Sequence, residues 1–249
     1  MMNLPKIEFK EISLQDNIDM IKWTYFEESE TMSMREYTIQ CFPELKDIST
    51  NLSQSEVNKI IEEVVTKNYN ESLDFLKEEA KRYNKLWKEY NDKYFKELSL
   101  YLNINWPNEI KIIEATVGIL PVFPRNLDEF SFSIGIGIED SKIIEVCAHE
   151  TLHFLWFEKW KKIHPETPKE EYDSPYLVWQ YSEMVTDPIL NNKPFSNIFS
   201  FTEYGYDYFY DLVDNDSKVM DNLRNIYKEE ITVEEKINKG FKYISHFLE

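Results

Sequence analysis

Residues 140–160 of the chain read DSKIIEVCAHETLHFLWFEKW, and this stretch decides how the rest of the sequence is interpreted. As a helix it would be apolar almost all round, which predicts that the helix is buried. Asp140 or Ser141 can serve as its N-cap. Three polar side chains interrupt the apolar run, and burying them is unfavourable unless a metal ion or hydrogen bonds compensate for lost water.

The first two of these polar residues to consider are His149 and His153, whose spacing of four residues places both imidazoles on one side of the helix. This is the spacing at which a helix chelates zinc. Glu150 lies about 100 degrees further round the helix, beside the ion without binding it, where it can take a proton from water. We therefore interpret His149 and His153 as metal ligands and Glu150 as the catalytic base.

A catalytic zinc site takes three protein ligands and keeps an open position, so a third ligand must come from elsewhere. Metzincin-type proteases supply it from the same stretch, as a glycine followed by a histidine, but those positions are Trp156 and Lys159 here. Peptide deformylases supply a cysteine. Cys147, however, points to roughly the opposite side of the helix, and Cys41 lies far away in the sequence.

Further along the chain, Glu183 and Asp187 stand four residues apart, which places two carboxylates on one face of a helix. The two motifs together, His-Glu-x-x-His and Glu-x-x-x-Asp, resemble the signature of the gluzincins, the superfamily of thermolysin-like zinc metallopeptidases. The resemblance covers roughly residues 110–190. It implies that Glu183 is the third zinc ligand and that Asp187 orients a ligating histidine from outside the ligand set.

Two assignments stay open. Asp173 lies close to where the spacing of thermolysin would place the third ligand. It precedes the helix that is expected to begin near Ser174 and Pro175 and to end or kink before Pro188, so Glu183 is preferred. Gluzincins also stabilise the reacting oxyanion with a tyrosine or histidine that follows the third ligand. Candidates for that role are Tyr204, Tyr206, Tyr208, Tyr210 and His246.

The pattern of the chain changes near residue 105. Residues 1–105 are predicted to form a helical region, because their apolar residues recur at helical spacing from about residue 14 to residue 102. Residues 106–249 are predicted to form a zincin-like metallohydrolase region that ends in an amphipathic helix at 233–248, and the two regions could be one integrated domain. The predicted fold class is α+β and predominantly helical.

Two strands are predicted before the motif helix, at residues 110–117 and 130–138, and the small sheet that contains them is expected to pack on that helix. In the second strand, large apolar residues fall on one face while serine and glycine occupy the other. The small-residue face suits either close packing of a helix against the sheet or an edge at which a substrate backbone can pair.

The formal net charge of -18 creates a negative field that repels phosphate backbones and anionic lipids, so neither nucleic acid nor a membrane is expected as a partner. The start of the chain lacks the apolar core of a secretory signal, and no apolar run approaches the roughly 18 residues of a membrane span. The 2 cysteines fit a reducing compartment. The predicted location is the cytoplasm.

The sequence thus predicts a zinc-dependent metallopeptidase with one Zn2+ per chain, acting on a peptide or protein substrate with Glu150 as general base. The alternative is a non-catalytic protein of zincin fold that keeps a structural metal and binds a partner. Glu150 argues against it, because a structural zinc site needs no base and tends to close with a fourth ligand. A third interpretation is a helical scaffold without metal. The substrate and the oligomeric state do not follow from the sequence.

Overall fold

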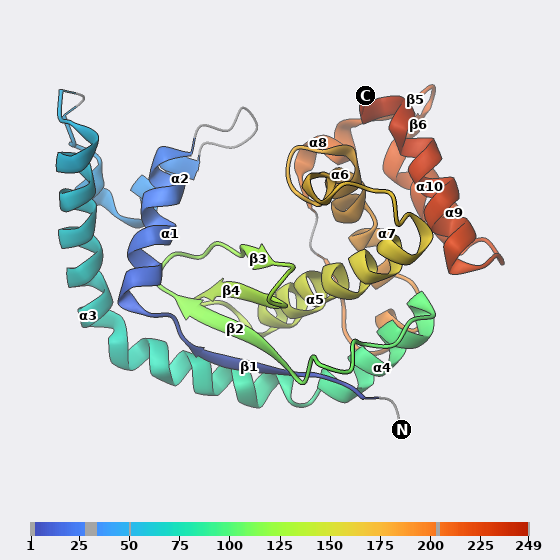
Figure 1. Cartoon of the computed structure of the whole chain (residues 1–249), viewed down its shortest axis with the longest axis horizontal. Coiled ribbons are helices and arrows are strands. Elements are labelled where there is room, and N and C mark those ends of the chain that lie inside the picture. Colours follow the sequence, from blue (N-terminus) through green and yellow to red (C-terminus); the bar gives the residue numbers. More distant parts are fainter. Residues whose placement is uncertain (1–2, 28–33, 50, 203–204, 249) are drawn as a thin grey trace. The chain divides into compact units, whose positions relative to one another are not determined.

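The structure of the chain, a computed structural model, describes residues 3–27, 34–49, 51–202 and 205–248 (Figure 1). Helices make up 61% of it and a small mixed sheet accompanies them, so the predicted α+β, predominantly helical class is confirmed. Within the described ranges, no helix combines the length and apolar character that a membrane crossing requires.

The chain divides into two compact units, each assembled from separate segments. We call one the site unit, which contains Met1–Lys6, Leu86–Ile112 and Glu139–Glu249. The other, the sheet unit, contains Ile7–Lys85 and Ile113–Ile138. The division expected near residue 105 therefore falls inside a segment of the site unit, and the first half of the chain is not a separate helical region.

The four-stranded sheet has the order β1-β2-β4-β3 (Figure 1). Its strands are β1 (Lys6–Glu11), β2 (Ile112–Gly118), β3 (Arg125–Asn126) and β4 (Ser131–Gly135). β2 and β4 run parallel and correspond to the two predicted strands, although β4 is shorter than predicted, and β3 pairs antiparallel with β4. Phe132 and Ile134 are buried, as the alternation of apolar residues predicted.

The small-residue face of β4 packs against the chain itself. A Cβ added to Gly135 would lie 2.5 Å from Cα of Pro121, so only glycine allows this approach. β4 also lies between β2 and β3 in the described sheet, and its Ser133 amide donates to the carbonyl of Pro124 at 2.9 Å. The close approach at Gly135 is thus to the connection between β2 and β3 and not to a helix, as the first interpretation expected, and β4 is not an edge strand of the described sheet.

The helices of the sheet unit form a core of their own. They are α1 (Leu14–Phe26), α2 (Met34–Cys41), the 3-10 turn η1 (Pro43–Leu45) and α3 (Gln54–Trp87), whose last residues belong to the site unit. Ile21 from α1, Leu45 from η1, and Ile61 and Val65 from α3 are fully buried together. The apolar stripes predicted for this part of the chain therefore face a common interior.

The site unit contains the motif helix, α5 (Asp140–Ile163), surrounded by shorter helices. α5 is buried along most of its length, as predicted, and it begins one residue after Glu139, which takes the N-cap position. The other elements are α4 (Asn91–Leu102), η2 (Lys169–Tyr172), α6 (Leu177–Met184), α7 (Thr186–Leu190), η3 (Phe195–Asn197), α8 (Asp207–Asp211), β5 (Val213–Asp214), β6 (Ser217–Lys218), α9 (Val219–Lys228) and α10 (Val233–Leu248).

α6 and α7 replace the single helix that was expected from Ser174 to the region of Pro188. The helix is interrupted at Val185. Pro188 has no N–H to donate to the carbonyl of Met184, and in a continuous helix its ring would clash with that carbonyl. The break predicted before Pro188 is thus confirmed. It separates the two carboxylates of the second motif, with Glu183 in α6 and Asp187 in α7.

Candidate metal centre

His149 and His153 meet on one side of α5. Their Nε2 atoms lie 3.0 Å apart and their ring centroids 4.7 Å apart. His153 is fully buried and His149 is 8% exposed. The helix is anchored just before this pair, because the buried Tyr94 hydroxyl of α4 donates to the carbonyl of Ala148 at 2.6 Å. The two imidazoles therefore project from a fixed stretch of backbone.

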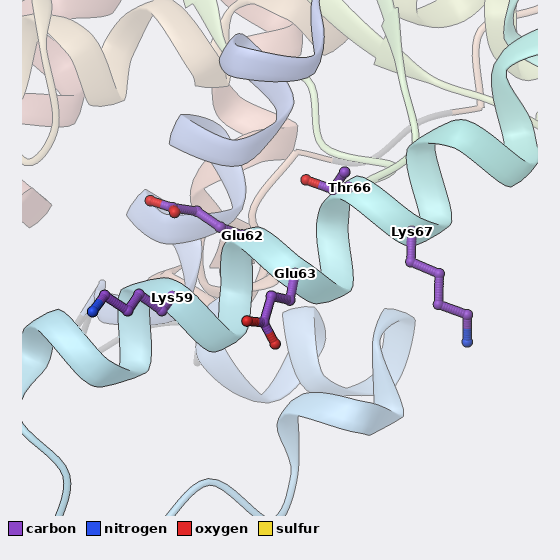
Figure 2. A pocket seen from close by; sticks show the side chains of 5 residues that line it. All are labelled: Lys59, Glu62, Glu63, Thr66 and Lys67. Atoms are coloured by element: carbon purple, nitrogen blue, oxygen red, sulfur yellow. The ribbon is translucent and has the colours of Figure 1, made fainter.

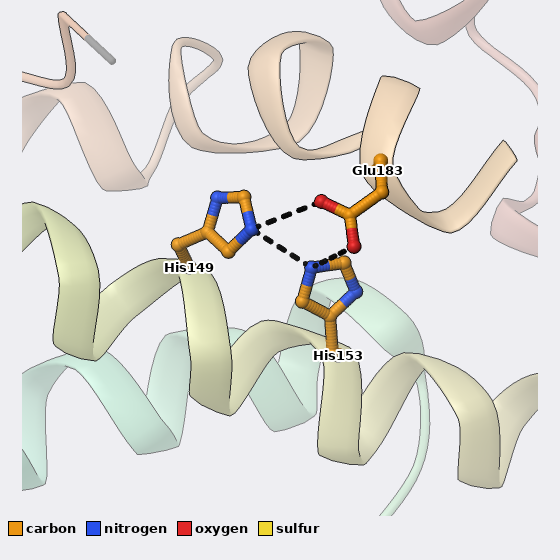
Figure 3. A group of neighbouring side chains, drawn as sticks. All are labelled: His149, His153 and Glu183. Atoms are coloured by element: carbon orange, nitrogen blue, oxygen red, sulfur yellow. Dashed lines mark hydrogen bonds and ion pairs between the residues drawn. The ribbon is translucent and has the colours of Figure 1, made fainter. Parts of the chain in front are cut away.

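Glu183 reaches the pair from α6 (Figure 3). Its Oε2 lies 3.3 Å from Nε2 of His149, and its Oε1 lies 3.5 Å from Nε2 of His153. In the described part of the chain, these three residues are the only group of three or more His, Cys, Asp or Glu side chains placed to hold a metal ion. The structure therefore brings the two histidines and the preferred third residue together.

The donor atoms of the three residues lie close to the spacing that a tetrahedral metal ion requires. Ligand atoms about 2.0–2.1 Å from zinc at tetrahedral angles lie about 3.3 Å from one another. The two imidazole nitrogens lie 3.0 Å apart, and each faces a different oxygen of Glu183, at 3.3 and 3.5 Å. One donor atom from each residue can be chosen so that all three lie within 4.8 Å of one another, which leaves room for a small shift onto an ion. Two imidazole nitrogens and one carboxylate oxygen are also a donor set that zinc takes in catalytic sites, where the fourth position stays open.

Glu150 follows the first histidine and is 5% exposed. Burial, and then the negative charge of Glu150, raise the pKa of the Cys147 thiol well above its usual value. Cys147 is fully buried, so it is held as a neutral thiol and is not part of the metal group. Its absence from the group agrees with its position two residues before His149, which predicts that the thiol points to another side of the helix.

Asp173, the other candidate for the third ligand, lies elsewhere. It ends η2 and is exposed, and its amide donates to the carbonyl of Glu170 at 3.1 Å. It is not a member of the group that includes Glu183. The geometry therefore favours Glu183 over Asp173.

Asp187 is buried, but its partners differ from the one that the gluzincin resemblance implies. Among the described residues, its carboxylate accepts hydrogen bonds from Asn191 Nδ2 at 2.9 Å, from the Tyr210 hydroxyl at 3.1 Å and from Arg224 Nε at 3.1 Å. Glu183 and Asp187, which the break at Val185 places in two helices, therefore have different partners. Asp187 thus ties α9 and α8 to α7.

Arg224 was not identified from the sequence, since no spacing connects it to either motif. Burial lowers its pKa, but hydrogen bonding to Asp187 and the negative charge of Asp187 raise it more, so the pKa stays above its usual value. Burial, and secondly the negative charge of Asp187, raise the pKa of Tyr210. Arg224 is therefore a permanent cation that compensates for the buried charge of Asp187.

The tyrosine and histidine candidates for oxyanion stabilisation are dispersed. Tyr204 lies outside the described residues, and His246 is exposed in the last turn of α10. The Tyr206 ring contacts a tryptophan of α6, and Tyr210 is held by Asp187. Burial, and then the charge of Glu183, raise the pKa of Tyr208 to about 12. Among the described candidates, Tyr208 is thus the one whose pKa responds to the charge of Glu183.

A surface hollow on α3 in the sheet unit offers no comparable chemistry (Figure 2). All the residues that line it come from this one helix, namely Lys59, Glu62, Glu63, Thr66 and Lys67. They carry mixed charges, and Glu62 is paired with Lys22 at 2.6 Å. This is the solvated face of a long helix, where side chains do not converge on a ligand.

Comparison with known proteins adds no relative: no protein-family model, no curated protein and no solved structure matches this chain.

Proposed function

We propose that this chain is a zinc-dependent metallopeptidase with a zincin-like catalytic region, in which His149, His153 and Glu183 hold one Zn2+. The observation that supports it most is the meeting of three buried side chains from two different helices, with the imidazole nitrogens 3.0 Å apart and one oxygen of Glu183 facing each of them at 3.3 and 3.5 Å. A metal ion would compensate these polar atoms for the water that they lose on folding.

The side chains have distinct roles in this proposal. His149, His153 and Glu183 would hold the zinc ion, which would supply Lewis-acid chemistry by polarising a substrate carbonyl and lowering the pKa of water towards about 7. The carboxylate of Glu150 accepts the proton of the attacking water and passes it to the nitrogen of the leaving amine. Burial of all four residues keeps bulk water away from these steps.

The alternative, a non-catalytic protein with a structural metal, is less well supported. A structural zinc site is closed by four protein ligands, whereas the group found among the described residues supplies three. The resemblance of the two motifs to the gluzincins, with a glutamate next to the first histidine, also favours hydrolysis. Cys41 and Cys147 are free thiols, which fits the proposed cytoplasmic location.

The proposal is tested with Glu150→Gln, a change that keeps size and hydrogen bonding but removes the base. We expect unchanged zinc content and a loss of peptide hydrolysis of about 10²- to 10⁴-fold. The readout is cleavage of a diverse peptide library followed by mass spectrometry. Glu158→Gln is the matched control. Glu158 lies on the same helix, but it makes a salt bridge with Lys161, whose side chain is 45% exposed.

Hydrolysis that survives Glu150→Gln at the rate of the Glu158→Gln control would contradict the assigned role of the base. A wild-type protein that binds one zinc per chain but cleaves nothing in the library would favour the structural-metal alternative instead.

A further inference from the structure

The face of α6 that carries Glu183 continues away from the metal centre as a row of large side chains. Gln180 and Trp179 precede Glu183 by three and four residues, and Tyr176 lies one further turn back, at the N-cap. Side chains at these spacings share one face of a helix. The row therefore begins at the metal ligand and runs towards the start of α6.

A second segment lies beside this row. Gly205 is close to the third ligand, because a Cβ there would be 4.0 Å from the carbonyl oxygen of Glu183. Just after it, the Tyr206 ring meets the Trp179 ring edge to face at 5.3 Å, and the Tyr208 hydroxyl donates to Oε1 of Gln180 at 3.4 Å. The rings of Tyr206 and Tyr208 are 5.9 Å apart.

These contacts join Trp179, Tyr206 and Tyr208 into an aromatic wall next to the candidate metal centre, and Tyr176 extends the wall along the same face of α6. Its rings differ in burial from the rings that pack on the core side of α6. Tyr181 of α6 and Trp156 of α5 are fully buried and lie 5.6 Å apart. In contrast, Tyr176 is 44% exposed, and the other three wall residues are partly exposed. The wall therefore keeps apolar surface that a bound molecule can cover.

We propose that this wall is a specificity site that binds a large aromatic side chain of the substrate, close to the bond that is cleaved. The inference rests on the proposed peptidase function and names its substrate class: peptides with Phe, Tyr or Trp near the scissile bond. Aromatic rings that meet edge to face or offset gain affinity beyond the burial of their area, and the wall presents rings at several angles.

The test measures binding, so that it does not depend on turnover. Zinc-loaded Glu150→Gln protein is immobilised, a random peptide library is passed over it, and the retained peptides are identified by mass spectrometry. We expect peptides with an aromatic residue to be retained about 2- to 10-fold over those with alanine at that place, the ratio that one aromatic pair supplies. Adding Trp179→Ala or Tyr176→Ala should remove most of this enrichment.

Trp23→Ala in the same background is the control, because Trp23 is 51% exposed on α1 in the sheet unit. It should leave the enrichment intact. Zinc content verifies that each variant is folded, and the exposed position of Tyr176 makes that change the milder of the two.

An enrichment that persists in both wall variants, or a preference for basic over aromatic residues, would overturn the inference. Its failure is distinct from failure of the proposed function. If aromatic peptides are enriched but the wild type hydrolyses no peptide, only the proposed peptidase function is contradicted. If hydrolysis depends on zinc and Glu150 but aromatic peptides are not enriched, only the proposed specificity site is contradicted.

Discussion

At the scale of single residues, Glu183 is the side chain on which the proposed metal centre depends. Its two carboxylate oxygens face the two imidazoles separately, Oε2 towards His149 and Oε1 towards His153. It is buried and comes from a different helix than the histidines. Without it, the two imidazoles would remain one turn apart on α5, and two protein ligands hold zinc much less firmly than three.

Glu183→Ala should therefore lower zinc affinity strongly, whereas Asp173→Ala should leave it nearly unchanged, because Asp173 is exposed at the end of η2. The measurement is a competition titration of each purified variant against a fluorescent zinc chelator. If Asp173→Ala lost more zinc affinity than Glu183→Ala, Asp173 would be the third ligand and our assignment of Glu183 would be wrong.

The sequence predicted His149, Glu150 and His153 because their relation is local: one helix fixes all three by spacing alone. Glu183 followed only from resemblance to a known motif. The partners of Asp187 could not be predicted, since Arg224 comes from α9 and no periodicity connects it to α7. Contacts between distant segments depend on tertiary packing, which single-residue patterns do not encode.

At the scale of elements, α3 is fastened to the segment that follows β4. The carboxylate of the buried Glu79 accepts hydrogen bonds from Arg82 Nε at 2.7 Å, from the Tyr83 hydroxyl at 3.0 Å and from the Gly137 amide at 3.0 Å. Arg82 also donates to the carbonyl of Ile138 at 2.8 Å. Hydrogen bonding to Arg82, above all, lowers the pKa of Glu79.

Glu79→Gln should destabilise the protein by about 1–2 kcal/mol near neutral pH, the range for losing charge-assisted hydrogen bonds to a partly exposed arginine. The folded pKa of Glu79 is lowered, so its stabilising contribution is fully present above the unfolded value of about 4.3 and is lost as pH falls through the folded pKa. The difference between wild type and variant should therefore shrink in acid.

Urea unfolding of both proteins in steps from about pH 7 down to about pH 3, well below the unfolded pKa of about 4.3, measures this difference. Glu78→Gln is the matched control, because Glu78 precedes Glu79 in the same helix but is exposed. A difference that stays constant over this range, or that grows in acid, would show that the charge of Glu79 is not what stabilises the contact.

The elements themselves were predicted unevenly. α10 matches its predicted range, 233–248, because its amphipathic period extends over several turns. β1 was missed, although Ile7 and Phe9 are buried and alternate with charged residues. The stretch is short, and the Ile12 amide that follows it bonds to the Val117 carbonyl, far along the chain. A six-residue pattern gives little signal when its pairing partner is so distant.

At the scale of the whole molecule, the net charge of -18 acts on any charged substrate that approaches the chain. We expect matched peptides with lysine near the scissile bond to be cleaved faster than those with glutamate, at low ionic strength. The preference should weaken with added salt, because the screening length falls from about 10 Å at 0.1 M to about 3 Å at 1 M.

Cleavage rates of the two peptides at both ionic strengths check this. A faster rate for the glutamate peptide, or a ratio that does not respond to salt, would mean that local contacts at the site outweigh the overall field.

The central claim is that His149 and His153 hold a metal ion, and metal content tests it most directly. Protein purified without added zinc should contain about one zinc per chain by mass spectrometry of the metals, as one three-ligand site requires. His246→Ala, at an exposed histidine, should keep that content. The double variant His149→Ala/His153→Ala should contain none. Full zinc occupancy in the double variant would contradict the account.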